Sequence, residues 1–435
     1  MTHISRCIEW VSDGLGPSRP CWPTEPSLSA IETLARQHLR LSVDAPCKVS
    51  FFAEGAFNKL YNIEINTEDS NSAYLMRVAL PVDPRWKTLS EVATLRFVRQ
   101  TSSISLVPNI LGFDAGSDPN ALGYEWMIME RLPGKTLEVH WKRISWEAKR
   151  QLVETIVDIL ARLYDHPFSG IGNIFPPEAL SASPFSSPSP NINVGRIVAM
   201  DFFWDKHFDQ DVPRGPFRSS YEWLTARLSF VVNDSDELLC TSHTEADEDD
   251  IEEAEESKAL AERLLRLLPI LFPPPGYVER SVIHHDDLSF HNILVDDNGS
   301  LTGIVDWECV SALPLWKACQ FPAFLVSPDQ MERPDPARYG MEEHSATPNQ
   351  LYFEHLLQWE KTQLRAIFVK EMERVRPEWM REHRAAERKA DFDLAVQYCN
   401  VELSRKIVKN WVDHMEKLDK GETGNYISLR AQLIA

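Results

Sequence analysis

The pattern of hydrophobic and polar positions predicts strands in the first part of the chain. Between residues 47 and 80, apolar and polar residues alternate around the polar run NTEDSNS, which is typical of adjacent strands joined by a turn. Residues 87–100 instead carry apolar side chains at helical spacing, at Leu89, Val92, Leu95 and Phe97. The runs NILGFDAG and YEWMIMERL return to strand-like composition. This order predicts a small lobe with an antiparallel sheet and one helix, ending near Leu132.

A further helix is expected before these strands, after an irregular N-terminal arm. Residues 1–28 are rich in Pro, Ser and Trp and have no regular apolar spacing. The stretch SAIETLARQHL then opens with Ser29 and has Glu32 three residues later, which is the spacing of a capping box. We therefore expect a helix to begin at Ser29.

Beyond Leu132 the pattern becomes mostly helical. Residues 145–165 open with an N-cap serine and carry apolar residues at helical spacing, and two long amphipathic runs follow at 351–374 and 391–416. Residues 181–190 have the composition of a low-complexity loop. We predict an α+β protein of two lobes, a small one at 1–132 and a larger, mostly helical one at 133–435.

A short island of strands within the helical part concentrates polar chemistry. Residues 281–308 read SVIHHDDLSFHNILVDDNGSLTGIVDWE, with DDNG as the turn of a predicted hairpin. Carboxylates held close together are costly unless a cation or a reacting group lies among them. This stretch is therefore a metal site, an acid–base site, or both, at the expected cleft between the lobes.

Composition narrows the class of partner. Asp and Glu outnumber Lys and Arg by 65 to 45, and the formal net charge of −20 argues against a nucleic-acid partner and weakly favours a cationic small molecule. Many of these acids lie in the run at 245–257, which we interpret as a solvated insert. The seven cysteines are scattered, and we find no signal peptide or membrane span, so we expect a cytoplasmic protein without a membrane partner.

The polar island contains the residue set that phosphoryl transfer requires. His285, Asp287 and Asn292 have the spacing H-x-D-x-x-x-x-N, and Asp306 follows Asp287 by 19 residues in IVDWE. In such a site one carboxylate receives the proton of the acceptor hydroxyl, while a second carboxylate and an amide oxygen hold magnesium on the nucleotide phosphates. Mg²⁺ prefers oxygen ligands and keeps several waters, so one Asp and one Asn suffice.

Together, HHDDLSFHNIL and IVDWE resemble the aminoglycoside phosphotransferase and choline kinase group, which has the protein-kinase-like fold. The resemblance covers residues 45–330 and departs at Asp286, where the group usually has glycine. It implies that Asp287 is the catalytic base, that Asn292 and Asp306 bind the metal, and that His285 braces the loop. It also implies ATP and Mg²⁺ as cofactors and a small-molecule hydroxyl acceptor as substrate.

The first lobe would then bind the nucleotide. EGAFNKLYNI lies where the group has its phosphate-covering hairpin, which gives Gly55 and the backbone N–H groups of Ala56, Phe57 and Asn58 as candidates for phosphate contacts. The alternative is an ordinary strand turn, because a single glycine is a weak signal.

Two further segments extend the resemblance in this lobe. Arg77 stands where kinases place the lysine that contacts the α/β-phosphates, with Glu91 as its expected partner, whereas the alternative is an arginine that faces solvent. WMIMERLPG resembles the hinge between the lobes, where the backbone of Met129 and Arg131 would meet the adenine and Met127 would back it.

The acceptor site is less defined by the sequence. Residues 201–208 and 215–228 are rich in aromatic side chains, and an aromatic and acidic pocket would suit a cationic amine. Glu308 either faces the acceptor or forms a salt bridge behind Asp306.

Three alternatives to a small-molecule kinase stay open. A protein kinase is disfavoured because D-F-G and A-P-E motifs are missing from the sequence. A non-catalytic nucleotide-binding protein of the same fold is favoured by Arg77 and the single glycine, but disfavoured by Asp287, Asn292 and Asp306. A phosphohydrolase could use HHDD as a metal cluster, although the predicted hairpin and the spacing to Asp306 fit this less well.

Overall fold

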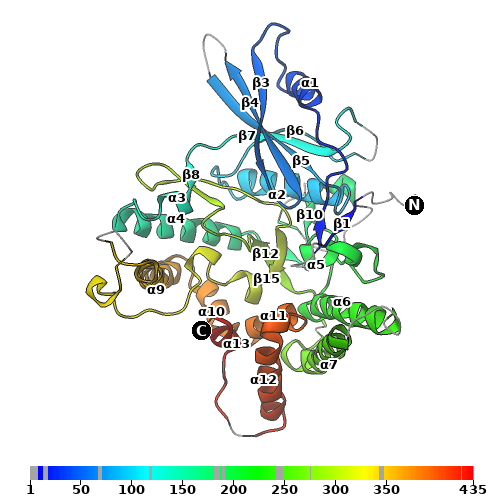
Figure 1. Cartoon of the computed structure of the whole chain (residues 1–435), viewed down its shortest axis with the longest axis vertical. Coiled ribbons are helices and arrows are strands. Elements are labelled where there is room, and N and C mark those ends of the chain that lie inside the picture. Colours follow the sequence, from blue (N-terminus) through cyan, green and yellow to red (C-terminus); the bar gives the residue numbers. More distant parts are fainter. Residues whose placement is uncertain are drawn as a thin grey trace.

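The protein is a bilobal α+β molecule, as the sequence predicts (Figure 1). The computed structural model describes residues 8–12, 18–66, 71–116, 120–180, 187–188, 192–241, 248–274, 276–341, 347–422 and 424–434. The five-stranded sheet lies at one end of the long axis, and most of the helices lie towards the other end.

The small lobe is built on one antiparallel sheet with the strand order β3-β4-β5-β7-β6. Its strands are β3 (Cys47–Glu54), β4 (Asn58–Asn66), β5 (Asn71–Ala79), β6 (Ile110–Asp114) and β7 (Glu125–Glu130). Helix α2 (Trp86–Gln100) connects β5 to β6. Arg77 on β5 pairs with Leu60 on β4 and Met127 on β7, so these three side chains share one face of the sheet.

The opposite face of the sheet is covered by α1 (Leu28–His38), a second helix in this lobe. Ile31 and Ala35 pack there against residues such as Met76 and Trp126. The expected start at Ser29 is wrong. Ser27 is the N-cap, and its hydroxyl accepts from the Ala30 N–H, while Glu32 pairs with Arg36 one turn later at 2.9 Å.

The larger lobe contains eleven of the described α-helices. They are α3 (Leu137–His140), α4 (Trp146–Tyr164), α5 (Met200–Phe203), α6 (Ser220–Thr241), α7 (Glu248–Leu271), α8 (Leu315–Ala318), α9 (Gln350–Val375), α10 (Pro377–Ala385), α11 (Glu387–Tyr398) and α12 (Glu402–Asp419), followed by α13 (Leu429–Ile434) at the end of the chain. No helix in the described part of the chain is both long and apolar enough to cross a membrane.

Short strands complete the architecture. They are β1 (Trp10–Val11), β2 (Arg19–Pro20), β8 (Lys135–Thr136), β9 (Phe168–Ser169), β10 (Ile174–Phe175), β11 (Asn193–Val194), β12 (Arg280–His284), β13 (Ile293–Val295), β14 (Leu301–Ile304) and β15 (Ser311–Pro314). The hairpin predicted around DDNG is present, because β13 and β14 pair antiparallel. It forms the sheet β14-β13-β8, while β12 lies in the sheet β15-β12-β9.

In the larger lobe, two of the predicted helices are confirmed, and one prediction needs correction. Residues 145–165 correspond to α4, whose N-cap is Ser145, and 351–374 to α9. The run 391–416 is not one helix, because the chain turns between α11 and α12. In the predicted loop 181–190, residues 181–186 and 189–190 lie outside the described part.

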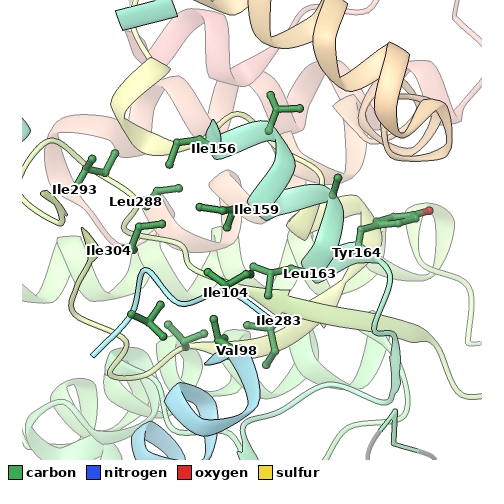
Figure 2. Packing of buried hydrophobic residues seen from close by; sticks show 14 of the residues in the cluster. Val98, Ile104, Ile156, Ile159, Leu163, Tyr164, Ile283, Leu288, Ile293 and Ile304 are labelled. Atoms are coloured by element: carbon green, nitrogen blue, oxygen red, sulfur yellow. The ribbon is translucent and has the colours of Figure 1, made fainter. Parts of the chain in front are cut away.

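A buried core around α4 fixes the strands that carry the polar island. Figure 2 shows Ile156 and Ile159 of α4 turned towards Leu288, Ile293 and Ile304, which belong to β13, β14 and the loop before them. All of these side chains are almost fully buried. The polar loops therefore rest on a rigid apolar base.

The connection between the lobes requires a glycine at position 134. Gly134 has φ +100°, and a Cβ there would lie 2.4 Å from Thr302 Oγ1 and 2.6 Å from the Val295 carbonyl oxygen. Because these contacts are with β13 and β14, the connection is held against the polar hairpin.

The acidic run at 245–257 differs from the expected solvated insert. Residues 248–257 form the first turns of α7, where Ala254 and Ser257 are buried, and 245–247 lie outside the described residues. Arg405 of α12 contacts Glu253 Oε1 at 2.9 Å. The helical pattern was hidden in the sequence because the acids occupy the exposed face of an otherwise packed helix.

Candidate active site

The loop between β12 and β13 is braced by His285. Its ring is buried, its Nε2 lies 3.0 Å from the Val305 carbonyl oxygen, and it meets the Trp307 ring edge-on at 4.9 Å between centroids. The ring therefore ties the loop before β13 to the segment after β14. This geometry is what a bracing histidine would have.

Asn292 orients Asp287. The Asn292 amide nitrogen donates to the Asp287 carboxylate at 2.7 Å and to the Asp287 carbonyl oxygen at 2.9 Å. The Asn292 amide oxygen accepts no hydrogen bond within the described residues, and the Asp287 side chain is exposed to the cleft. The amide nitrogen thus fixes the loop, and the amide oxygen is available to a ligand.

Asp306 lies beside this loop on the neighbouring backbone segment. The Val305 N–H donates to the Asn292 carbonyl oxygen at 2.9 Å, which brings the two segments together. Asp306 has φ 64°, in the left-handed region, and its side chain is 41% exposed. Backbone conformations of this kind in residues with a Cβ are concentrated at functional sites.

The available oxygen donors fit Mg²⁺. Asp306 offers a half-exposed carboxylate and Asn292 an amide oxygen without a protein donor, which matches a hard cation that keeps several waters. Among the described residues there is no group of three or more His, Cys, Asp or Glu side chains that could hold a metal ion.

Arg77 is buried and bound to three carboxylates. Its Nη1 lies 2.8 Å from Glu91 of α2, and its Nη2 lies 2.7 Å from Glu308 and 3.1 Å from Asp306. The alternative of an arginine that faces solvent is therefore wrong. Burial raises the pKa of Glu91, because the Arg77 charge only partly offsets the loss of water.

Glu308 is the centre of this polar network. Its Oε2 accepts from Asn58 Nδ2 at 2.8 Å and lies 2.6 Å from Lys87 Nζ, in addition to its contact with Arg77. Burial alone would raise the pKa of Glu308, but Arg77 and Lys87 outweigh it and lower the pKa to about 2. Glu308 thus forms the salt bridge that was one of its two predicted roles, while its side chain also reaches the wall of the adjacent cavity.

The hairpin between β3 and β4 closes as a tight turn. The Gly55 N–H donates to the Asn58 carbonyl oxygen at 2.9 Å, so this N–H is already used within the turn. Gly55 has no left-handed φ, and a Cβ there would lie 4.0 Å from the nearest atom, so the fold itself does not require glycine. Ala56 lies at the exposed tip.

Phe57 at this tip packs onto the larger lobe. Its ring lies 5.3 Å from Phe203 of α5 and 5.7 Å from Trp204, between centroids, and it is buried. The hairpin therefore makes an apolar contact across the cleft.

The predicted hinge runs along β7. Met127 and Met129 are buried, and Met129 pairs with Leu75 of β5. Arg131 is exposed, donates to Asn62 Oδ1 at 3.0 Å and lies over the Phe52 ring at 5.0 Å.

A cavity of about 470 Å³ opens beside the loop between β12 and β13. Asp286 and Asp287 line it, and an aromatic wall comes from Phe57, Trp223 and Phe230. Asp286 is exposed, and its side chain forms no ion pair in the described part of the chain. The part of the cavity next to Asp287 is therefore lined by two carboxyl groups that form no ion pair within the described residues.

Two cations of the cavity wall are paired with a buried carboxylate. Asp393 of α11 is buried and pairs with Arg227 of α6 and, at 2.5 Å, with Lys317 of α8. Arg227 also lies 2.6 Å from Asp201. Burial and Lys317 lower the pKa of His284 to about 3, so this histidine of the wall is neutral.

A comparison with models of protein families shows to which family the chain belongs. The model described as the phosphotransferase enzyme family matches residues 48–316, which is more than half of the chain. This chain belongs to the phosphotransferase enzyme family. The matched residues include Arg77, Asp287, Asn292 and Asp306, and the structure confirms the bilobal α+β fold expected from the sequence.

Curated relatives of this phosphotransferase-family protein are distant. A subtelomeric hrmA-associated cluster protein of Aspergillus fumigatus is 22% identical over 311 residues, which is 63% of this chain and 60% of the relative. The clavilactone A biosynthesis cluster protein Y of Ampulloclitocybe clavipes is 25% identical over 65% of this chain and 66% of its own length. The chain thus matches about 60% of the length of the first relative.

Solved structures show a weak overall likeness. The streptomycin-ATP-APH(2'')-IIa ternary complex is 13% identical with a TM-score of 0.40, and covers 91% of this chain and 97% of its own. An ethanolamine kinase of Plasmodium vivax is 12% identical with a TM-score of 0.37, and covers 93% and 87%.

Some site residues of this family member were missed in the sequence. Lys87 lies four positions before Glu91 and therefore on the same face of α2, which was a usable signal. Asp393 lies far from the motifs along the chain, and no local pattern marks it as part of the cavity wall.

Proposed function

We propose that this phosphotransferase-family protein is an ATP- and Mg²⁺-dependent kinase that transfers the γ-phosphoryl group to a hydroxyl group of a small molecule. The observation that carries the proposal is the arrangement of Asp287, Asn292 and Asp306 on two adjoining loops, with the buried Arg77–Glu91 ion pair beside Asp306. Phosphoryl transfer depends on positioning and on neutralisation of charge, and both are available in this arrangement.

The nucleotide would lie between the small lobe at 1–132 and the larger lobe at 133–435. Asp306 and Asn292 would hold Mg²⁺, which when bound neutralises charge on the phosphates. Arg77 would contact a phosphate, since a guanidinium binds phosphate and carboxylate with the same bidentate geometry. The backbone of Met129 and Arg131 would meet the adenine, and the hairpin at Gly55–Asn58 would cover the phosphates.

Asp287 would receive the proton of the acceptor. Its carboxylate faces the cavity and is held by Asn292, so an acceptor hydroxyl in the cavity lies within its reach. Removal of the proton would make the oxygen a better nucleophile for the in-line attack on the γ-phosphorus. His285 would keep the loop in place without taking part in the reaction.

We infer that the acceptor is a hydroxylated amine, such as an amino sugar or an amine-bearing secondary metabolite. Within the described residues Asp286 and Asp287 form no ion pair, whereas Arg227 and Lys317 are already paired with Asp393. A cytoplasmic location remains part of this proposal, because six described cysteines are free.

The test is nucleotide consumption by purified protein in the presence of Mg²⁺ and a panel of hydroxylated amines, amino sugars and neutral polyols. We expect turnover with at least one amine and none with the neutral polyols. A protein that binds Mg·ATP but phosphorylates no member of the panel would favour a non-catalytic role. Phosphorylation of a protein substrate instead would overturn the small-molecule proposal.

A further inference from the structure

Lys87 is a buried lysine that the proposed reaction does not yet use. It lies in the first turn of α2, its side chain is 2% exposed, and its Nζ is 2.6 Å from Glu308 and 2.9 Å from Asn58 Oδ1. A buried ammonium group is costly unless it is paired and hydrogen-bonded. Glu308 and Asn58 therefore stabilise the charged Lys87 side chain in its buried position.

Glu308 joins three separate elements through its contacts. These contacts are with Asn58 at the tip of the hairpin, with Arg77 on β5 and with Lys87 on α2. Glu308 itself follows Asp306 by two residues, so the proposed metal-binding segment and the proposed phosphate-covering hairpin are tied to the same carboxylate. Asn58 is held from both ends, because its amide nitrogen donates to Glu308 and its amide oxygen accepts from Lys87.

The charges in this network determine how readily Arg77 can leave a carboxylate to contact a phosphate. Its Nη2 is shared between Glu308 at 2.7 Å and Asp306 at 3.1 Å. To reach a phosphate, this nitrogen must give up a carboxylate. If Arg77 were the only cation on Glu308, that step would leave a buried carboxylate unpaired, which is strongly unfavourable. Lys87 is a second cation on the same oxygen.

We propose that Lys87 is a positioning residue that keeps Glu308 neutralised and Asn58 anchored, and thereby frees Arg77 to exchange a carboxylate for a nucleotide phosphate. This inference rests on the proposed nucleotide-binding function. It assigns Lys87 no contact with the substrate. Its effect on the nucleotide passes through Arg77 and through the hairpin tip.

The test measures binding of Mg·ATP by calorimetry, without an acceptor. In Lys87→Met, Glu308 has Arg77 as its remaining cation and holds it more tightly, so we expect affinity to fall by about tenfold or more. In the double variant Lys87→Met/Glu308→Gln, the Glu308 charge no longer retains Arg77, whose ion pairs with Glu91 and Asp306 remain, and we expect most of the lost affinity to return. A lysine that only supports the fold would give no such recovery.

Lys149 provides a matched control. It is a buried lysine of α4 whose Nζ lies 2.8 Å from Glu360, so Lys149→Met also breaks a buried ion pair, but away from the cleft. We expect a lower melting temperature for Lys149→Met with unchanged affinity for Mg·ATP. Lys87→Gln serves as a second variant if Lys87→Met does not fold, because it removes the charge and keeps a polar group for Asn58.

A readout without nucleotide completes the test. Hydrogen exchange of the amides at 55–58 should be faster in Lys87→Met than in the unmodified protein, and unchanged in Lys149→Met. Equal Mg·ATP affinity in the Lys87 variants and the unmodified protein, or no recovery in the double variant, would overturn the inference alone. An unmodified protein that does not bind Mg·ATP would overturn the proposed function as well.

Discussion

Asp306 and Cys309 both occupy the left-handed backbone region, with φ 64° and 58°. Each such residue costs about 1–3 kcal/mol, so packing on either side must impose the conformation. Trp307 between them is fully buried, and its indole N–H donates to the Ile304 carbonyl oxygen at 3.0 Å. Burial of this ring keeps the half-exposed Asp306 side chain in the cleft. Spacing in the sequence marked Asp306 as a candidate ligand, but it contained no signal for the strained backbone.

Asp306→Ala should weaken Mg²⁺-dependent binding of ATP far more than Asp287→Ala does. Asp306 would be a direct metal ligand, whereas Asp287 would face the acceptor. Calorimetry with Mg²⁺ and with a chelator measures both variants. Equal ATP affinity of the unmodified protein in the two solutions would contradict the assignment of Asp306 and Asn292 as metal ligands.

Asp287→Asn should lower turnover by about 10²–10⁴-fold, which is the usual contribution of a general base. The substituted amide keeps an oxygen that can accept from Asn292, so the loop geometry and the affinity for ATP should change little. Turnover, ATP affinity and bound metal are measured on the same preparation. Loss of bound metal from this variant would show that Asp287 is a metal ligand, as a phosphohydrolase would require.

His207 should make stability depend on pH. Burial alone would lower its pKa, but the hydrogen bond with Asp234 at 2.7 Å and the nearby charges raise the pKa above 6.5. The protonated ring therefore stabilises the folded state fully below about pH 6.5, and this contribution is lost as the pH rises through the raised pKa. Melting temperatures should differ more between the unmodified protein and His207→Gln at pH 6 than at pH 9. The same difference at both pH values would contradict the raised pKa.

At the scale of elements, local signals were reliable where one residue or turn decides the structure. Ser145 was predicted to cap α4, and DDNG to join β13 and β14, because cap and turn chemistry acts over a few residues. The break between α11 and α12 was missed, since the amphipathic pattern continues across a short turn. The N-cap of α1 was placed two residues late because two serines compete there and only the fold selects Ser27.

Because the start of α7 is packed, contacts to it should contribute to stability, whereas contacts to a solvated insert should not. Arg405 is buried, and its guanidinium donates to the Glu253 carbonyl oxygen and side chain, both at 2.9 Å. Arg405→Met should lower the free energy of unfolding by about 1–3 kcal/mol, because the hydrogen bonds from a buried guanidinium to the partly buried start of α7 are lost. Chemical denaturation measures this change. Arg381→Met on the exposed face of α10 is the control and should have almost no effect. No loss in Arg405→Met would restore the view of residues 248–257 as an independent insert.

At the scale of the whole molecule, contacts between distant positions complete the site. Asn58 and Glu308 are 250 positions apart, and Arg77 and Asp306 are 229 apart. A motif can indicate that each residue has a role, but one sequence contains no signal for which of them meet. Arg77 with Glu91 was predictable because a kinase-like lobe brings β5 and the following helix together. The place of Lys87 on the same face of α2 as Glu91 was a usable signal, but its partners could not be predicted, because they come from a hairpin tip and from the other lobe.

Phe57 connects the lobes at the cavity, and its replacement should affect both stability and acceptor binding. Its buried ring contacts Phe203 and Trp204 of the larger lobe and lines the cavity. Phe57→Ala should lower the free energy of unfolding by about 3–5 kcal/mol, as is usual for buried phenylalanines. Because part of the cavity wall is lost, KM for the acceptor should rise, while the affinity for Mg·ATP should change less.

Phe175→Ala separates these two effects. Phe175 is buried in the same apolar cluster and packs edge-on against Trp86 at 5.3 Å between centroids, but it does not line the cavity. Its loss should lower stability by a similar amount and leave the acceptor KM unchanged. The comparison uses denaturation curves together with acceptor KM at saturating Mg·ATP, for whichever acceptor is phosphorylated. If both variants raised the acceptor KM equally, the effect would come from general loosening of the two lobes, and Phe57 would have no specific part in the acceptor site.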